Sequence, residues 1–287
     1  MIQLFTDTSA NLPRELVNKY GISVIPCTYT MDGVEHIPDT DKFDGKAYYD
    51  AMRAGSDVKT SMINVACFGE YFGKALEKGD DVLYIGMSGG ISGTAHAAQL
   101  AVRELSESYP DRKIIAVDTL GASLGEGMLA LEAAEKILEG MDISEIAGHV
   151  RGLIPHMCQC FTVDDLRYLK KNGRISGAAS LIGNMLGIRP LLIGNDEGKI
   201  ILKDKVRGAK KVLDAMANRY AELVLDKMQD IGIAHADNEA GKAYLVQRLR
   251  DKGFTGKYLS VCYEPVTGSH VGPGAVALFF FGTDRMA

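Results

Sequence analysis

A chain of 287 residues is long enough for one large domain or two ordinary ones. Hydrophobic residues make up 46% of it and charged residues 24%, which excludes wholesale disorder. The net charge of -5 argues against a whole-surface attraction to nucleic acid or to an anionic membrane.

The five cysteines are an odd number, which favours reduced, mostly buried thiols over a disulfide framework. The first residues have no basic region and reach a carboxylate at Asp7, which is unlike a signal peptide. The best candidate for a membrane span, residues 275–281, is far too short. We therefore expect a soluble, cytoplasmic protein with no stable membrane insertion.

Short apolar runs alternate with amphipathic stretches from the first residues onward. The apolar runs predict strands at residues 2–5, 22–25, 81–85, 113–117 and 231–234. Apolar residues at 3.6-residue spacing predict helices at residues 46–53, 67–78, 95–107, 124–139, 207–227 and 239–252. A further helix is expected to begin near Pro13, capped by Ser9 or Asn11. Strands that alternate with helices indicate an α/β protein with a largely parallel sheet.

The pattern changes near residue 155. After it, strands are predicted at 188–193 and 199–204, and the Gly, Asn and Asp residues of 194–198 predict a hairpin loop between them. We therefore expect two α/β domains, at 1–158 and 159–287. A cleft between two domains is a usual place for a small ligand.

The strongest local signal is the loop at 86–94, between a predicted strand and a predicted helix. Its glycines allow close backbone approach, and free amides at a helix start attract anions. Ser92 and Thr94 add hydroxyl donors. The loop spells neither a Walker A motif nor Gly-x-Gly-x-x-Gly. A tight turn whose hydroxyls only cap the helix is an equally good interpretation.

The same loop contains the spelling of a nucleophile elbow, Gly86-x-Ser88-x-Gly90. Asp237 and His270 follow in the chain order that a serine hydrolase or esterase requires. Four more loop residues separate Ser88 from the helix, whereas an elbow serine turns directly into its helix. The hydrolase is therefore the lesser alternative.

Short polar clusters fall just after predicted strands, namely Asp7-Thr8-Ser9, Thr60-Ser61 after Val58-Lys59, and Asp118-Thr119. Each alone is better explained as a turn or a cap. The carboxyl ends of parallel strands meet at one edge of a sheet, where ligands bind. Together, the hydroxyl groups favour hydrogen bonds to an anion over chelation of a metal.

Three further features carry candidate chemistry. His270 is expected in a Gly/Pro-rich turn, 268–275, before an apolar strand, where it would suit a carboxylate. Basic residues are concentrated at 167–174 and 203–211. They form either a solvated helix face or a local positive site for phosphate or an acidic partner. The alternating set His156, Cys158 and Cys160 is interpreted as a buried strand face rather than a zinc site.

Taken in order, these motifs resemble the DegV family of fatty-acid-binding proteins. The matching segments span the chain: Thr6-Asp7-Thr8-Ser9, Lys59-Thr60-Ser61, Ser88-Gly89-Gly90-Ile91-Ser92-Gly93-Thr94, Val117-Asp118-Thr119, Asp165-Leu166-Arg167-Tyr168-Leu169, Gly173-Arg174-Ile175-Ser176, Val206-Arg207 and Ser269-His270-Val271-Gly272-Pro273-Gly274. No single segment is decisive, but their shared order is specific.

The resemblance implies two α/β domains, the first with a Rossmann-like parallel sheet and flanking helices, and no enzymatic activity, cofactor or metal. It also implies a long-chain fatty acid in an apolar tunnel, whose walls we expect to include residues 181–193. The carboxylate would lie at the matching positions, which are Thr60, Ser61, Ser92, Gly93, Thr94 and His270.

The resemblance further implies a partner, the ATP-binding subunit of a bacterial fatty acid kinase. That subunit would phosphorylate the carboxylate, and the carrier would then take the acyl phosphate toward phospholipid synthesis. Arg174 and Arg207 match positions that would serve the phosphate or partner docking. The chain departs from the family at Met62-Ile63, where Gln-Pro is usual, and at Ser269, where Ala is common; both departures bear on ligand preference.

Overall fold

The structure, a computed structural model, describes residues 1–39, 42–175 and 187–286. Its first sheet is parallel and has the strand order β2-β1-β6-β7. The strands are β1 (Ile2–Asp7), β2 (Ser23–Ile25), β6 (Asp81–Gly86) and β7 (Ile114–Asp118). The four strands predicted in this half are confirmed, and they lie in one parallel sheet as expected.

The second sheet has the strand order β10-β9-β8-β13-β11-β12. Its strands are β8 (Met157–Thr162), β9 (Ile188–Gly194), β10 (Ile200–Arg207), β11 (Ile231–His235), β12 (Tyr258–Cys262) and β13 (Val276–Phe281). Only β11 and β12 pair in parallel. The second sheet is therefore mostly antiparallel, because β9 and β10 form the predicted hairpin and β13 inserts antiparallel between β8 and β11.

A small antiparallel sheet, in the order β4-β3-β5, was not predicted. Its strands are β3 (Thr28–Met31), β4 (Val34–His36) and β5 (Val58–Ser61). Every residue of β4 is exposed and none of β3 is fully buried, so neither strand shows an apolar run or a clear alternation. This sheet matters because it carries Thr60.

The helices are α1 (Arg14–Tyr20), α2 (Gly45–Ala54), α3 (Val65–Leu76), α4 (Thr94–Ser108), α5 (Leu124–Leu138), α6 (Ile143–Leu153), α7 (Arg167–Lys171), α8 (Ala209–Leu223), α9 (Glu239–Asp251) and α10 (Pro265–Val271), with short 3₁₀ turns at Thr8–Ala10 and Ile154–His156. In the described part of the chain, no helix is both long and apolar enough to cross a membrane.

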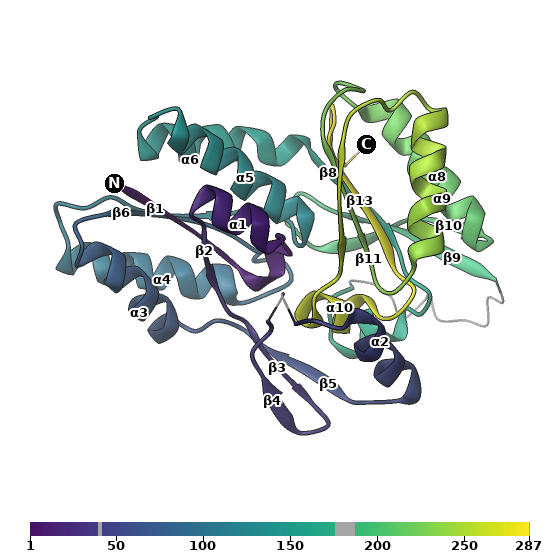
Figure 1. Cartoon of the computed structure of the whole chain (residues 1–287), viewed down its shortest axis with the longest axis horizontal. Helices are drawn as coiled ribbons and strands as arrows, with labels where there is room; N and C mark the ends of the chain where they lie inside the picture. Colours follow the sequence, from purple (N-terminus) through teal and green to yellow (C-terminus); the bar gives the residue numbers. More distant parts are fainter. Residues whose placement is uncertain (40–41, 176–186, 287) are drawn as a thin grey trace.

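Helices cover both faces of the parallel sheet (Figure 1). Phe5 and Tyr84 belong to the core under α3 and α4, whereas Leu4 and Leu83 belong to the core under α5 and α6. This division follows from the strand period, since successive side chains point to opposite faces. Helix α5 also contacts β8, β11 and β13, so one core extends from the first sheet to the second.

The other face of the second sheet is covered by α8 and α9 (Figure 1). Cys158 and Cys160 are buried in that core, which confirms that they lie on a buried strand face. His156 lies before the strand, where its Nδ1 is 3.0 Å from the carbonyl oxygen of Gly282.

Two helix boundaries differ from the expectation. Helix α8 is shorter than the predicted 207–227 and follows Gly208, because Arg207 still pairs with Ile188 at the end of β10. Helix α1 has Pro13 at its N-cap and no side-chain cap, so the prediction of Ser9 or Asn11 is wrong.

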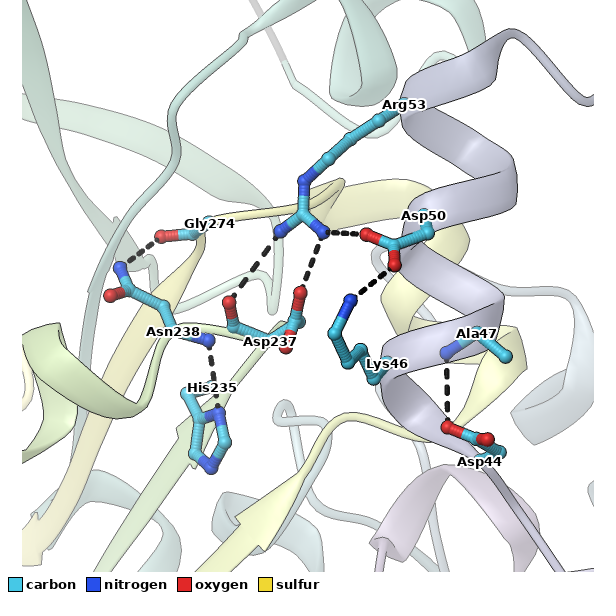
Figure 2. A network of polar contacts seen from close by, with 9 residues as sticks. All are labelled: Asp44, Lys46, Ala47, Asp50, Arg53, His235, Asp237, Asn238 and Gly274. Carbon is cyan, nitrogen blue, oxygen red and sulfur yellow. Dashed lines mark hydrogen bonds and ion pairs between the residues drawn. The ribbon is translucent and has the colours of Figure 1, made fainter.

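An ion-pair network joins α2 to the turn between β11 and α9 (Figure 2). Arg53 Nη1 lies 2.6 Å from Asp237 Oδ2 and 2.9 Å from Asp50 Oδ1. Asp50 also pairs with Lys46 one turn earlier in α2. Water screens these half-exposed groups, so the network orients α2 against the second half of the chain more than it stabilises the fold.

Two carboxyl groups are buried together where β1, β6 and α5 meet. Asp7 is 1% exposed and Glu126 is 0% exposed. Asp7 accepts hydrogen bonds from Ser9 N at 2.8 Å and from the Tyr84 hydroxyl at 2.5 Å. Ser9 Oγ lies between the two carboxyl groups, 2.5 Å from Asp7 Oδ1 and 2.7 Å from Glu126 Oε2. The donors around Asp7 suit an ionised carboxylate.

Glu126 is the neutral member of the pair. The Thr6 hydroxyl donates to the carbonyl oxygen of Ile85 at 2.8 Å, and a carbonyl can only accept. Glu126 Oε1 lies 3.0 Å from the same Thr6 oxygen, so the proton of that contact comes from a protonated Glu126. Burial, followed by the charge of Asp7, raises the pKa of Glu126 well above its ordinary value, in agreement with this assignment.

Glu126→Gln should therefore keep the free energy of unfolding within about 1 kcal/mol of the wild type, because an amide N–H replaces the carboxyl proton. Asp7→Asn should lower it by about 2–4 kcal/mol, because an amide N–H would face groups that donate. Urea denaturation at neutral pH, followed by circular dichroism, measures both variants. Equal losses would contradict the assigned proton.

Candidate lipid-binding site

A cavity of about 250 Å³ is enclosed by segments from both halves of the chain. Its apolar lining consists of Cys27, Met62, Met87, Ile91, Leu120, Ala122, Phe161, Leu169, Ile200, Tyr263, Val266, Val271 and Phe279. Its polar lining consists of Thr60, Ser61, Ser92, Thr94, Ser123, Gln159, Arg174, Thr267 and His270. A largely apolar cavity with a few polar groups suits an amphipathic small molecule.

Three of the expected site residues meet in one part of the lining. Thr60 Oγ1 lies 3.0 Å from His270 Nε2. The charge of Arg174 acts on His270, and Arg174 Nε donates to the carbonyl oxygen of Ile91 at 3.1 Å, next to Ser92. We use the name polar cluster for these three residues, Thr60, Arg174 and His270, together with Ser92 and Thr94, which also line the cavity.

Helix α10 carries His270, and neighbouring side chains fix its position. Glu264 accepts hydrogen bonds at 2.5 and 2.6 Å from two backbone N–H groups of its first turn. The Tyr49 hydroxyl donates to the carbonyl oxygen of Tyr263 at 2.7 Å. A Cβ at position 268 would lie 2.1 Å from that hydroxyl oxygen, so glycine is required there. The expectation that His270 lies in a turn is wrong: Glu264 supplies the cap that starts a helix.

His270 is neutral at physiological pH. Burial, followed by the positive charge of Arg174, lowers its pKa from 6.5 to about 4. A neutral imidazole has one donor and one acceptor nitrogen. With the proton on Nε2, His270 donates to Thr60 Oγ1, and the Thr60 hydroxyl proton can turn toward a ligand. Within the described residues, Nδ1 is buried without a partner.

The loop after β6 supplies a hydrogen-bond acceptor at the start of α4 and also lines the cavity. Ser92 Oγ accepts from Thr94 N at 3.2 Å and donates to Thr94 Oγ1 at 2.9 Å, at the start of α4. Both hydroxyl residues also line the cavity. A Cβ at Gly93 would lie 2.7 Å from Sδ of Met62, the residue after β5, so the Met62 side chain would have to move.

The two arginines of the expected phosphate or docking site are separated. Arg174 lines the cavity and is held by the carbonyl oxygens of Ile91 and Asn172. Arg207 is exposed at the end of β10 and is not part of the cavity lining. Ser176, from the motif that follows Arg174, lies outside the described residues, and so do residues 181–186 of the expected tunnel wall. Leu191 and Ile193, from the described part of that wall, pack instead in the core under α8.

Only one of the three polar clusters after strands lies at the cavity. Thr60 and Ser61 line it. Asp7 belongs to the buried carboxyl pair, and Asp118 accepts from the backbone N–H groups of Gly89 and Leu120 at 3.0 and 2.9 Å. The expectation that all three bind an anion is therefore wrong for two, whose side chains hold their own loops.

The structure does not support the hydrolase triad. Ser88 is buried, and its hydroxyl donates to the carbonyl oxygen of Gly198 at 2.8 Å. Asp237 pairs with Arg53 on α2 (Figure 2), and His270 contacts Thr60. These three residues therefore have separate partners, and Ser88 is not poised as a nucleophile.

Three polar residues of the lining, Ser123, Gln159 and Thr267, were not found from the sequence. Thr267 lies on α10 one turn before His270, where helical spacing would have paired them had the helix been recognised. Gln159 lies between Cys158 and Cys160 on β8, so its side chain points to the opposite face of the strand, toward the cavity. A polar residue between two buried cysteines was the signal in the sequence that could have identified it. Thr267 Oγ1 and Gln159 Nε2 are buried without partners among the described residues.

Comparison with known proteins assigns the chain to a family. A family model described as an uncharacterised protein of the DegV family matches residues 1–283. The chain belongs to the DegV family. A DegV domain-containing protein of Clostridium perfringens is 36% identical over 284 residues, which is 98% of each chain. Another, from Streptococcus pyogenes, is 31% identical over 280 residues, which is 97% of each chain.

Solved structures of DegV proteins share the fold. The structure of a DegV family protein from Thermus thermophilus, solved for its fatty acid binding, has a TM-score of 0.87 at 29% identity and covers 98% of this chain and 99% of that one. The fatty-acid-binding DegV family protein of Streptococcus agalactiae has a TM-score of 0.86 at 32% identity, covering 97% and 98%. The family resemblance of the motifs is thereby confirmed.

The state of His270 predicts how stability depends on pH. Once unfolded, the histidine takes up a proton near its ordinary pKa of 6.5, whereas the folded protein resists protonation down to about 4. Stability is therefore retained above pH 6.5 and falls between 6.5 and 4. The loss should reach at most about 3 kcal/mol and should be missing in His270→Asn. Urea denaturation of lipid-free protein across this range tests it; parallel profiles for the two proteins would contradict it.

Proposed function

We propose that this DegV protein binds one long-chain fatty acid, with the acyl chain along the apolar lining and the carboxylate at the polar cluster. One observation carries the proposal: the apolar lining and the polar cluster belong to the same cavity. The fatty acid binding of the Thermus thermophilus and Streptococcus agalactiae relatives supports it.

The two parts of the cavity supply different contributions to binding. An acyl chain of about fifteen CH₂ groups gains on the order of 12 kcal/mol from full burial, at about 0.8 each. Part of that gain offsets the freedom lost on binding. The carboxylate opposes burial, because an unpaired buried carboxylate costs several kcal/mol. The apolar lining therefore needs the hydroxyl donors and the positive charge of the polar cluster.

We assign the carboxylate to six residues: Thr60, Ser61, Ser92, Gly93, Thr94 and His270. The Thr60 hydroxyl donates to the carboxylate while His270 orients it through the contact of 3.0 Å. The Ser92 hydroxyl, which donates to Thr94 Oγ1 at 2.9 Å, turns to the carboxylate when the ligand binds. Gly93 leaves room for the Met62 side chain. Arg174 adds a positive charge that favours the ionised form of the ligand.

We further propose that the protein is a carrier that presents its cargo to a separate ATP-binding fatty acid kinase subunit. The carboxylate would be phosphorylated by that subunit, and the carrier would hold the acyl phosphate for phospholipid synthesis. A phosphoryl group brings additional negative charge, which Arg174 in the cavity wall is placed to offset. The exposed Arg207 is proposed to contact the kinase subunit.

Thr60→Val and Ser92→Ala should each weaken fatty acid binding about tenfold, because each removes one hydrogen bond to a charged group. Displacement of a fluorescent fatty acid from lipid-free protein measures the affinities. Ser106→Ala, which removes an exposed hydroxyl from α4, is the matched control and should bind as the wild type does. Wild-type affinity in both site variants would contradict the assigned carboxylate position.

Arg207→Ala should bind fatty acid with unchanged affinity but should lower the rate of acyl-phosphate formation by the kinase subunit, because Arg207 lies outside the cavity lining. The assay follows ATP-dependent formation of acyl phosphate at fixed concentrations of carrier and kinase. Arg103→Ala, an exposed arginine on α4, serves as the control. Equal rates for the two variants would contradict a docking role for Arg207.

A further inference from the structure

A second cavity, of about 200 Å³, lies at the edge of the six-stranded sheet and shares no lining residue with the lipid cavity. Its lining comes from the end of β8, from β9 and β13, and from the first two turns of α8 and α9, and it includes Thr162, Asp164, Arg189, Lys210 and Tyr244. At this edge β8 and β11 end, and the antiparallel strands β9 and β13 begin.

The start of α8 suits an anion. Its N-cap is Gly208, which offers no side-chain acceptor, and its first turn contains no acidic residue. Lys210 and Lys211 lie in that turn instead, where the positive end of the helix dipole disfavours cations. A bound anion would relieve this repulsion and would accept hydrogen bonds from the free backbone N–H groups.

Thr162 is a second and independent sign of a ligand. It is the last residue of β8 and lies on the same strand face as Cys158 and Cys160, toward α8. It lines the cavity and is only 5% exposed. Its Oγ1 has no hydrogen-bond partner among the described residues, although buried hydroxyl groups are normally paired.

Two cationic side chains complete the cavity. Arg189 Nη1 pairs with Asp164 Oδ1 at 2.5 Å, and Lys210 Nζ lies 5.4 Å from the centre of the Tyr244 ring. Asp164 is the one carboxylate of the described lining, whereas Arg189 and Lys210 are both cationic. The lining therefore carries a net positive charge. The negative charge of Asp164 should lower the affinity of the cavity for an anion.

We propose that this second cavity binds a small phosphate oxyanion, either free phosphate or the phosphate of a small phosphomonoester. The oxyanion accepts hydrogen bonds from the first-turn amides of α8 and from the Thr162 hydroxyl, and Lys210 and Arg189 supply positive charge. The site is independent of the fatty acid proposed for the other cavity, and it goes beyond that function.

Titration of the ¹⁵N-labelled full chain with inorganic phosphate tests the site, with sodium chloride at equal ionic strength as the reference. We expect saturable shifts of the amide signals of Ala209, Lys210 and Lys211. Thr162→Val, which keeps the side-chain shape, and Lys210→Met, which changes an exposed position, should each raise Kd about tenfold. Asp164→Asn should lower Kd several-fold. Lys78→Met, an exposed lysine outside the cavity lining, should leave Kd unchanged.

Methyl phosphate distinguishes the two sources of the oxyanion. Binding at least as tight as that of phosphate identifies a phosphomonoester, and much weaker binding identifies free phosphate. The proposal is overturned if the α8 amides show no saturable shift, if sodium chloride reproduces the shift, or if Lys210→Met and Asp164→Asn leave Kd at the wild-type value. The Asp164→Asn and Lys210→Met arms decide the question even if Thr162→Val does not fold.

Discussion

The hydrogen bond between Thr60 and His270 joins positions 210 residues apart in the chain. Its geometry depends on the small antiparallel sheet that carries Thr60 and on the Glu264 cap that starts α10. Tyr48 of α2 connects the two regions, because its ring centre lies 6.0 Å from that of Tyr29 on β3 and its hydroxyl donates to the carbonyl oxygen of Pro265, the first residue of α10, at 2.8 Å. The polar cluster is thus assembled from several elements, and a rearrangement of any one would move a donor away from the cavity.

Helix α5 gives the cavity its frame. One side of it packs on the parallel sheet and the other side contacts the mixed sheet, so the two sheets share a core. The buried pair of Asp7 and Glu126 anchors the same helix to β1. The buried polar groups are therefore of two kinds. Some of those at the lipid cavity have no hydrogen-bond partner among the described residues and can bind a ligand, whereas Asp7 and Glu126 are hydrogen-bonded to neighbouring side chains.

The sequence predicted the elements whose apolar pattern is strong, including all four strands of the parallel sheet and the β9–β10 hairpin. The short strands β3 and β4 escaped prediction because their side chains are largely exposed. Helix α10 escaped because its Gly and Pro residues are typical of a turn, and only the tertiary contact with Tyr49 explains Gly268. The division into domains at 158/159 stays a prediction.

The site was predictable only in part. The loop at 86–94 was recognisable as a polar strand-to-helix connection. That Thr60, Arg174 and His270 belong to the same site was predicted only through the family resemblance. Local pattern cannot show which of several hydroxyl clusters faces a cavity, because that depends on packing between distant segments. Asp7 and Asp118 illustrate the limit, since both lie at the carboxyl end of a strand as Thr60 does, yet both accept hydrogen bonds from the loop that follows their own strand.

The most direct test of the account is mass spectrometry of the purified protein, first under native conditions and then after solvent extraction. We predict one long-chain fatty acid per chain, lost on delipidation and regained on incubation with free fatty acid. An extract that contains no fatty acid, from a protein that also fails to take one up, would contradict the proposed function.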